Sequence, residues 1–230
     1  MMSHALLDTP QTTDESARSG WEGAEEISGS RFSAAIYNPF LWLGERRGMR
    51  ERRRRLLAGA RGRVLEIGAG TGLNVEHYPD GIETLVLAEP VEEMAARIDV
   101  SGRSGTTPVS VVRARAEDLP FADDMFDTVV STMVLCTVED AERSIAEIRR
   151  VLAPGGRLLF CEHVRSESAR LARWQDRLAR PWAAFAEGCQ CNRDTLEAIG
   201  AELSVERVER DKWRGMTPLV HPLVLGEAVA

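Results

Sequence analysis

Residues 64–72 read VLEIGAGTG, an apolar segment that runs directly into a loop with three glycines. Glycine tolerates positive φ and lets the backbone come close to a ligand, so this pattern predicts a buried strand followed by a ligand-binding turn. The spacing is G-x-G-x-G, whereas a dinucleotide fingerprint needs its third glycine at the position of Leu73. Glu66 lies two residues before Gly68, where a carboxylate opposes a pyrophosphate and favours a cation. The stretch therefore predicts a site for a nucleoside that carries positive charge.

Around this stretch, short β-branched segments alternate with helical patterns. Such alternation is typical of parallel strands joined by right-handed crossovers, so we expect an α/β fold. The expected strands are residues 63–67, 84–88, 109–113, 128–132 and 157–161. The expected helices between them lie near residues 73–78, 92–99 and 141–152. Residues 203–208 and 219–225 are also strand-like, and we expect them to pair antiparallel at one edge of the sheet.

The composition is that of a soluble globular protein with one core: 230 residues, 43% hydrophobic and 28% charged. The formal net charge of −7 argues against a nucleic-acid partner, whose phosphates a protein must neutralise. No apolar run approaches the ~18 residues of a membrane span, and we find no pattern of a secretory signal. Four cysteines are too few for a disulfide scaffold, so we expect a reducing, cytoplasmic setting.

The first 60 residues divide into two parts. Residues 1–30 are polar and are expected to form a mobile leader, after which residues 31–230 form a single domain. Residues 31–60 carry apolar side chains at helical spacing and predict a helical lid. Seven arginines lie within residues 45–55. We interpret them as a solvated helix face rather than as a site for phosphates or anionic head groups, because the chain is acidic overall and no aromatic residues interleave them.

Glu89 follows the second expected strand, about twenty residues after the glycine loop, where an acidic side chain can hydrogen-bond both hydroxyls of a ribose. The alternative is a surface glutamate that ends a strand. The position of Glu89 relative to the glycines favours the ribose.

These segments resemble the class I S-adenosylmethionine-dependent methyltransferases. The resemblance rests on residues 65–72 (LEIGAGTG), Glu89, residues 116–121 (AEDLPF) and residues 152–158 (LAPGGRL), in matching order and spacing. It implies a Rossmann-like, seven-stranded, mostly parallel sheet with helices on both faces. It also implies S-adenosylmethionine as the cofactor, with S-adenosylhomocysteine as its product. The cofactor core would be residues 61–165, and residues 166–230 would supply acceptor-side helices and edge strands. The expected cofactor-binding residues are Glu66, Gly68, Gly70, Thr71, Gly72, Asn74, Glu89, Pro90, Met94, Ala116, Glu117 and Thr132.

A closer resemblance is to the small thiol S-methyltransferases, which include alkyl-thiol enzymes and bacterial enzymes that cap dithiol natural products. It rests on residues 71–74 (TGLN), 77–79 (HYP), 133–138 (MVLCTV) and 162–164 (EHV). It implies methyl transfer to the thiolate of a small hydrophobic molecule, a dithiol natural product being one candidate. The alternative acceptors are carbon, oxygen or nitrogen atoms, as in a quinone, a phenol or a phospholipid amine. A third hypothesis, a module that binds the cofactor without catalysis, is disfavoured because the chain carries an acceptor region in addition to the intact glycine loop and Glu89.

His163 is the candidate catalytic base. Methyl transfer from a sulfonium is an in-line displacement, so the main task is to hold the acceptor behind the methyl carbon. A thiol of pKa ~8.5 needs only one modest base, and an imidazole titrates in the useful range. The alternative is a histidine whose ring bonds a backbone carbonyl near the end of its strand. The candidate acceptor-binding residues are Tyr37, Phe40, Met133, Cys136 and Trp182.

Cys189 and Cys191, together with His163, are the residues that suggest a metal site. Their Cys-x-Cys spacing and the lack of another cysteine pair argue against zinc, so we expect no metal. The expected partner is a small-molecule methyl acceptor, and the sequence leaves the oligomeric state open.

Overall fold

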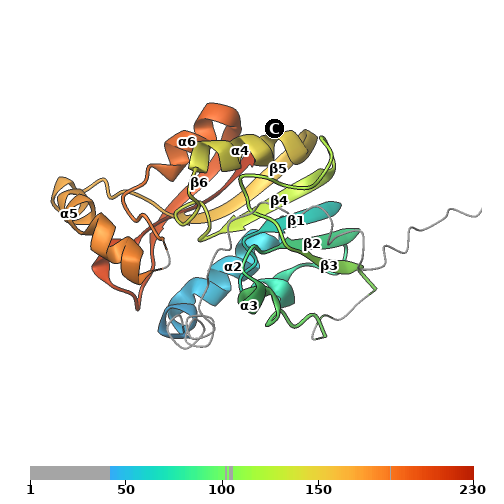
Figure 1. The fold of residues 1–230 in the computed structure, drawn as a ribbon, viewed down its shortest axis with the longest axis horizontal. Helices are drawn as coiled ribbons and strands as arrows, with labels where there is room; N and C mark the ends of the chain where they lie inside the picture. Colours follow the sequence, from blue (N-terminus) through green and yellow to red (C-terminus); the bar gives the residue numbers. More distant parts are fainter. Residues whose placement is uncertain (1–41, 102, 104–105, 187) are drawn as a thin grey trace, which may run out of the picture.

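The computed structural model describes residues 42–230 except 102, 104–105 and 187. The expected leader, the first part of the expected lid, and the candidate acceptor residues Tyr37 and Phe40 lie outside the described residues. Within the described part, one twisted sheet runs through the centre of the molecule with helices on each side (Figure 1). None of the helices in this part has the length and apolar character that crossing a membrane requires.

The described residues form a seven-stranded sheet in the order β3-β2-β1-β4-β5-β7-β6. Its first five strands in the chain run parallel, whereas β7 is antiparallel to both of its neighbours, β5 and β6. The strands are β1 (Arg63–Ile67), β2 (Thr84–Ala88), β3 (Val109–Val112), β4 (Phe126–Thr132), β5 (Leu152–His163), β6 (Ser204–Lys212) and β7 (Pro222–Val229). The predicted α/β fold and the antiparallel pair at the sheet edge are confirmed.

Helices cover both faces of the sheet, with α4 and α6 on one side and α2 and α3 on the other (Figure 1). Each face has its own buried core: Leu57 of α2 belongs to one, and Ile145 and Ile148 of α4 belong to the other. The helical elements are η1 (Glu45–Met49), α2 (Arg50–Leu57), η2 (Val75–His77), α3 (Glu92–Ala95), α4 (Ala141–Val151), α5 (Ala169–Phe185), α6 (Thr195–Glu202) and η3 (Pro218–Val220).

The helix expected near residues 73–78 is only the single 3₁₀ turn η2. Pro79 disfavours helical geometry at the residue before it, and Tyr78 is extended, with φ −68° and ψ 138°. The side chains of Asn74 and Tyr78, on either side of the turn, both hydrogen-bond the buried carboxyl group of Glu66. Side-chain hydrogen bonds to Glu66 of β1 therefore hold this segment, and the backbone hydrogen bonds of a longer helix do not form.

The carboxyl ends of β1, β4 and β5 lie side by side because these strands are parallel neighbours. β1 pairs with β2 on one side and with β4 on the other, so the order of the strands reverses at β1. In open α/β sheets, ligands bind at the carboxyl ends of the strands that flank such a reversal. The fold therefore brings three segments to one place: the glycine loop after Ile67, the loop after Thr132, and His163.

Candidate active site

The glycine loop follows β1 in a conformation that favours glycine. Gly68, Gly70 and Gly72 have φ values of +56°, +58° and +83°. A Cβ at Gly68 would lie 2.6 Å from a methyl group of Val134, so this glycine is needed where β1 packs against the loop after β4. A Cβ at Gly70 would meet nothing within 4 Å. The loop therefore packs tightly against the protein at Gly68. At Gly70 no protein atom lies close to the loop on the Cβ side, so a ligand can approach the backbone there.

Glu89 follows β2 and is buried, with 4% of its surface exposed. One carboxylate oxygen accepts the backbone N–H of Gly70 at 2.8 Å, and the other accepts that of Val91 at 2.9 Å. Two N–H donors hold the carboxylate beside the glycine loop. Pro90 follows Glu89 directly in the chain, and Met94 of α3 is buried.

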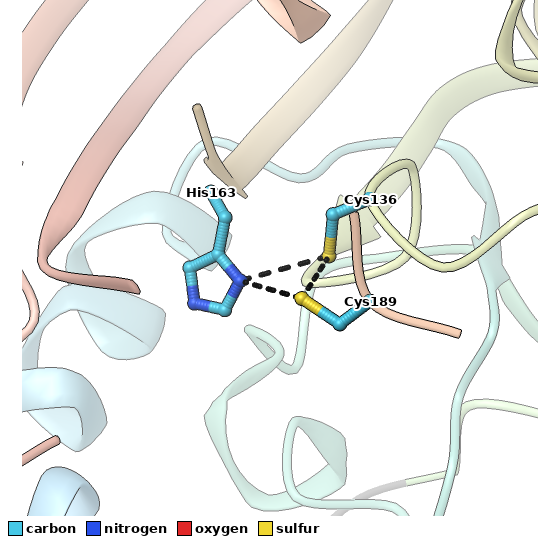
Figure 2. A group of neighbouring side chains, drawn as sticks. All are labelled: Cys136, His163 and Cys189. Carbon is cyan, nitrogen blue, oxygen red and sulfur yellow. Dashed lines mark hydrogen bonds between the residues drawn. The ribbon is translucent and has the colours of Figure 1, made fainter. Parts of the chain in front are cut away.

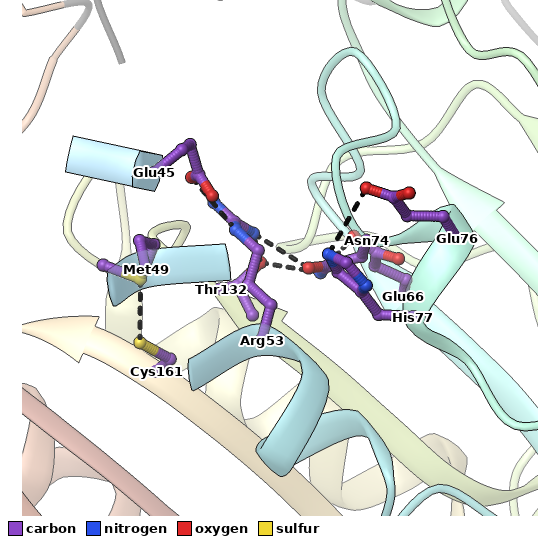
Figure 3. A network of polar contacts seen from close by, with 9 residues as sticks. All are labelled: Glu45, Met49, Arg53, Glu66, Asn74, Glu76, His77, Thr132 and Cys161. Carbon is purple, nitrogen blue, oxygen red and sulfur yellow. Dashed lines mark hydrogen bonds and ion pairs between the residues drawn. The ribbon is translucent and has the colours of Figure 1, made fainter. Parts of the chain in front are cut away.

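A buried polar network fills the space beneath the loop (Figure 3). Glu66 of β1 accepts hydrogen bonds from Asn74 Nδ2 at 2.8 Å and from the Tyr78 hydroxyl at 2.7 Å. Asn74 Nδ2 also donates to Thr132 Oγ1 at 2.9 Å, which links β1 to the end of β4. Burial raises the pKa of Glu66 to about 7, although Tyr78, Asn74 and the nearby Arg53 oppose the rise. Near neutral pH, a small change of local charge will therefore change the protonation of Glu66.

Arg53 of α2 joins this network. Its guanidinium donates to Asn74 Oδ1 at 2.9 Å, to Thr132 Oγ1 at 3.1 Å and to Glu45 at 3.2 Å (Figure 3). The prediction of a solvated arginine face is wrong for Arg53 and for its neighbour Arg52, which are 5% and 8% exposed. Both can be buried because their guanidinium groups have ionic or polar partners. The partner of Arg52 is the carboxylate of Asp211 in β6. The other five arginines of the cluster are exposed, as expected.

Ala116 and Glu117 lie in the loop after β3, and both are buried. The Glu117 carboxylate accepts the backbone N–H of Glu139 at 2.9 Å and lies 3.6 Å from the guanidinium of Arg115. Arg115 also pairs with Glu139 at 2.8 Å. These contacts tie the loop after β3 to the segment before α4, so this loop has a fixed position at the end of the sheet beside β2.

The loop after β4 holds a strained backbone at Met133. Met133 has φ +62°, which is costly for a residue with a side chain, and its N–H donates to Cys161 O at 2.9 Å. The buried Glu162 of β5 stabilises the same loop by accepting hydrogen bonds from Ser131 Oγ at 2.6 Å and from Val134 N at 3.1 Å. Burial raises the pKa of Glu162 above its usual value. The loop that bears Met133 and Cys136 is therefore fixed from β5.

His163, Cys136 and Cys189 meet at the carboxyl ends of β4 and β5 (Figure 2). His163 Nδ1 lies 3.6 Å from each sulfur, and the two sulfurs are 3.8 Å apart. His163 Nε2 is buried without a hydrogen-bond partner among the described residues, and the ring of Trp213 lies against the imidazole, with centroids 5.0 Å apart. The alternative in which a backbone carbonyl bonds the ring is therefore not what the structure shows for His163.

The cysteine partners differ from those that the sequence suggested. Cys189 lies next to Cys136, which is 53 residues earlier in the chain. Among the described residues, Cys136, His163 and Cys189 are close enough to hold one metal ion together, and Cys191 is not part of this group. The sulfurs of Cys136 and Cys189 share a hydrogen bond, and this bond together with His163 lowers the pKa of Cys189 well below the usual value of a thiol. The pKa of Cys136 is raised, chiefly by the same bond and by burial.

The glycine loop at the switch point, the acidic residue after the second strand and the antiparallel strand beside β5 are features of a Rossmann-like domain that binds a nucleoside. Residues 65–160 match the methyltransferase domain family. The human thiol S-methyltransferase TMT1B is 35% identical over 183 residues, which are 75% of this chain and 73% of that protein. The chain belongs to the class I S-adenosylmethionine-dependent methyltransferases, and S-adenosylmethionine is its cofactor.

Relatives with other named acceptors are nearly as similar. The phosphatidylethanolamine N-methyltransferase of Cereibacter sphaeroides is 35% identical, over 65% of this chain and 72% of that protein. The demethylmenaquinone methyltransferase of Thermobifida fusca is 31% identical, over 67% of this chain and 72% of that protein. The N-methyltransferase NodS of Bradyrhizobium japonicum, solved with S-adenosyl-L-homocysteine, shares the fold with a TM-score of 0.60 at 19% identity, over 89% of this chain and 94% of that one. The names of these relatives specify different methyl acceptors, so similarity alone does not identify the acceptor of this chain.

Proposed function

We propose that this enzyme methylates the thiol of a small, hydrophobic molecule. The observation that carries the proposal is the similarity to a thiol S-methyltransferase across three quarters of both chains. The buried His163, at the carboxyl end of β5 beside the loop after β4, supports it by offering an imidazole at the ligand-binding edge of the sheet. Trp182 and Met133, both partly buried against the same core, are the proposed apolar walls for the acceptor.

The cofactor residues of this proposal fit the geometry of the carboxyl ends of β1, β2 and β3. The open backbone at Gly70 and the neighbouring Thr71 are proposed to face the methionine portion, and Glu89 the ribose. Ala116 and Glu117, on the fixed loop after β3, are proposed for the adenine edge. When bound, S-adenosylmethionine supplies an electrophilic methyl group on a sulfonium. The protein's share of the work is to hold the acceptor in line and to promote the loss of its proton.

We propose that His163 promotes ionisation of the acceptor thiol. A thiol of pKa ~8.5 is mostly protonated at neutral pH, whereas the thiolate is a strong nucleophile. His163→Gln should therefore slow methylation of alkyl thiols much more than methylation of aryl thiols, which ionise without help. Equal slowing of both classes would contradict this role, since it would indicate a purely structural residue.

The experiment that tests the acceptor class is product mass spectrometry. The purified chain is incubated with S-adenosylmethionine and a matched panel of alkyl thiols, dithiols, alcohols, phenols, quinols and amines. A gain of one methyl group by thiols but not by the matched alcohols and amines is expected. Methylation confined to phenols, ring carbons or amines would overturn the thiol proposal, and the assignments of fold and cofactor would stand.

Replacing Gly70 with alanine tests the open face of the loop. Its φ of +58° makes alanine strained by about 1–2 kcal/mol, and the new methyl group would project where the cofactor approaches the backbone. Gly155 is a matched control, because its φ is +73° and its Cβ would also meet nothing within 4 Å. We expect similar losses of stability in urea for the two variants, but weaker cofactor binding, by about tenfold or more, only for Gly70→Ala. Equal affinities in calorimetry would contradict the placement.

The pKa of about 7 at Glu66 predicts a pH dependence of cofactor binding. Above this pKa the carboxyl group is charged and favours a cationic ligand, so affinity should rise between pH 6 and pH 8 by up to about tenfold. Glu66→Gln removes this titration and leaves that of the ligand itself, so the difference between the two proteins isolates the contribution of Glu66. If the affinity of both proteins for the cofactor changed with pH in the same way, the charge of Glu66 would not contribute to cofactor binding.

A further inference from the structure

The side chains of Cys136, His163 and Cys189 form a buried cluster of metal-ligand type. Three donor atoms from three separate segments, the loop after β4, the end of β5 and the segment after α5, all lie within 4.8 Å of one another. All three side chains are buried, and they point toward a common centre (Figure 2). The cluster therefore offers two sulfurs and one imidazole nitrogen to a single point.

The spacing of the donors matches the edges of a tetrahedron around zinc. With Zn–S bonds of about 2.3 Å and Zn–N bonds of about 2.0–2.1 Å, tetrahedral geometry places two sulfurs about 3.8 Å apart and a sulfur about 3.6 Å from a nitrogen. The measured separations are 3.8 Å between the sulfurs and 3.6 Å from His163 Nδ1 to each of them. The three residues can therefore take a zinc ion with little movement.

The charge at the cluster also suits a thiophilic cation. A bound divalent cation deprotonates the thiols that ligate it. Two thiolates and a neutral imidazole compensate the charge of a divalent ion. Among the described residues, no fourth histidine, cysteine, aspartate or glutamate belongs to the group. A Cys₂His set with one remaining position is the pattern of a zinc site that takes an exogenous ligand.

We propose that Cys136, Cys189 and His163 bind a zinc ion whose fourth ligand is the thiolate of the methyl acceptor. The identity of this fourth ligand rests on the proposed function, whereas the three-residue site stands on its own geometry. The acceptor thiol loses its proton to solvent as its sulfur joins the metal. After methyl transfer the sulfur is a neutral thioether, a weak ligand that leaves. With Nδ1 on the metal, the ring proton of His163 is on Nε2, so His163 promotes ionisation of the acceptor thiol as a metal ligand and does not accept the proton itself.

The test is titration of the chelator-treated, full-length protein with Co²⁺, followed by visible and near-ultraviolet absorption. We expect one equivalent to bind with the ligand-field bands of a tetrahedral site and with thiolate-to-metal charge-transfer bands, and Zn²⁺ to displace it. Cys136→Ser and Cys189→Ser should abolish these bands. Cys161→Ser and Cys191→Ser are matched controls, because both cysteines are buried and lie outside the cluster, and they should retain the bands. No binding by the chain, or equal binding by all four variants, would overturn the site.

Two further measurements separate this proposal from protein folding and from the proposed function. In the unmutated protein, Zn²⁺ should protect Cys136 and Cys189 from alkylation, as mapped by mass spectrometry, and should leave the reactivity of Cys161 unchanged. An alkyl thiol should shift the charge-transfer bands of the Co²⁺ protein, and the matched alcohol should not. Metal binding without any thiol product would keep the site and overturn the acceptor. Full thiol methylation by metal-free protein would overturn the catalytic metal and keep the acceptor.

Discussion

Glu89→Gln is expected to weaken S-adenosylmethionine binding about 100-fold, the largest effect of any single substitution proposed for the cofactor site. The carboxylate accepts backbone N–H groups from Gly70 and Val91 at 2.8 and 2.9 Å, which hold it beside the glycine loop, and it is proposed to bind the ribose hydroxyls. A hydrogen bond to a charged group contributes roughly 1.5–3 kcal/mol, and the glutamine amide must turn an N–H toward a backbone donor. A loss of about 3 kcal/mol corresponds to about 100-fold in affinity.

Isothermal titration calorimetry measures this effect directly. Glu92→Gln makes the same chemical change three residues later, on the exposed surface of α3, where Glu92 pairs with Arg113. This control should bind the cofactor as the unmodified protein does. Equal affinities of the two variants would show that the cofactor is not held at the end of β2.

Arg53→Met is expected to destabilise the folded protein by about 3 kcal/mol. The substitution keeps much of the side-chain volume but removes a buried charge that bonds Glu45, Asn74 and Thr132. Breaking a buried ionic network leaves its remaining members uncompensated, which is more costly than the intact network is stabilising. Glu45, with a side chain that is 17% exposed, would lose the buried end of its ion pair.

The neighbouring residue supplies the control for this second prediction. Arg54 also lies on α2 and also pairs with a glutamate, Glu51, but both of their side chains are more than half exposed. Such pairs contribute little, so Arg54→Met should leave the urea midpoint nearly unchanged. Coincident unfolding curves for the two variants would mean that the network around Arg53 is not part of the stability of the fold. Cofactor binding by folded Arg53→Met would then measure the role of the network in holding the glycine loop.

The sequence predicted those features that local patterns determine. Alternating strands and helices led to the sheet, and the loop around Gly68 and Gly70 led to the ligand-binding end of β1. Glu89 followed from its distance to that loop, and the structure places its carboxylate on Gly70 N. In each case the informative residues lie within about twenty positions of one another, so a pattern within one βαβ unit contains them.

The features that were missed depend on contacts between distant segments. The burial of Arg52 depends on Asp211, which is 159 residues away and belongs to the far edge of the sheet. Cys136 and Cys189 are brought together across 53 residues by the packing of the segment after α5 on the loop after β4. Neither an arginine cluster nor a Cys-x-Cys pair reveals such partners, because spacing along the chain does not report tertiary neighbours. An apolar segment before Cys136 and another before His163 were the only local signals that these residues lie near a core.

The position of β7 within the sheet has a consequence for biosynthesis. β7 comes after β6 in the chain but lies between β5 and β6, where His163 is paired with Leu223. As the chain emerges from the ribosome, β1 to β4 can complete their pairing early, whereas β5 has one free edge until Pro222–Val229 has been made. The ligand-binding end of β1 can therefore form during translation, but the environment of His163 is completed only afterwards. A nascent chain of this enzyme should gain the capacity to hold its cofactor before it gains a finished acceptor pocket.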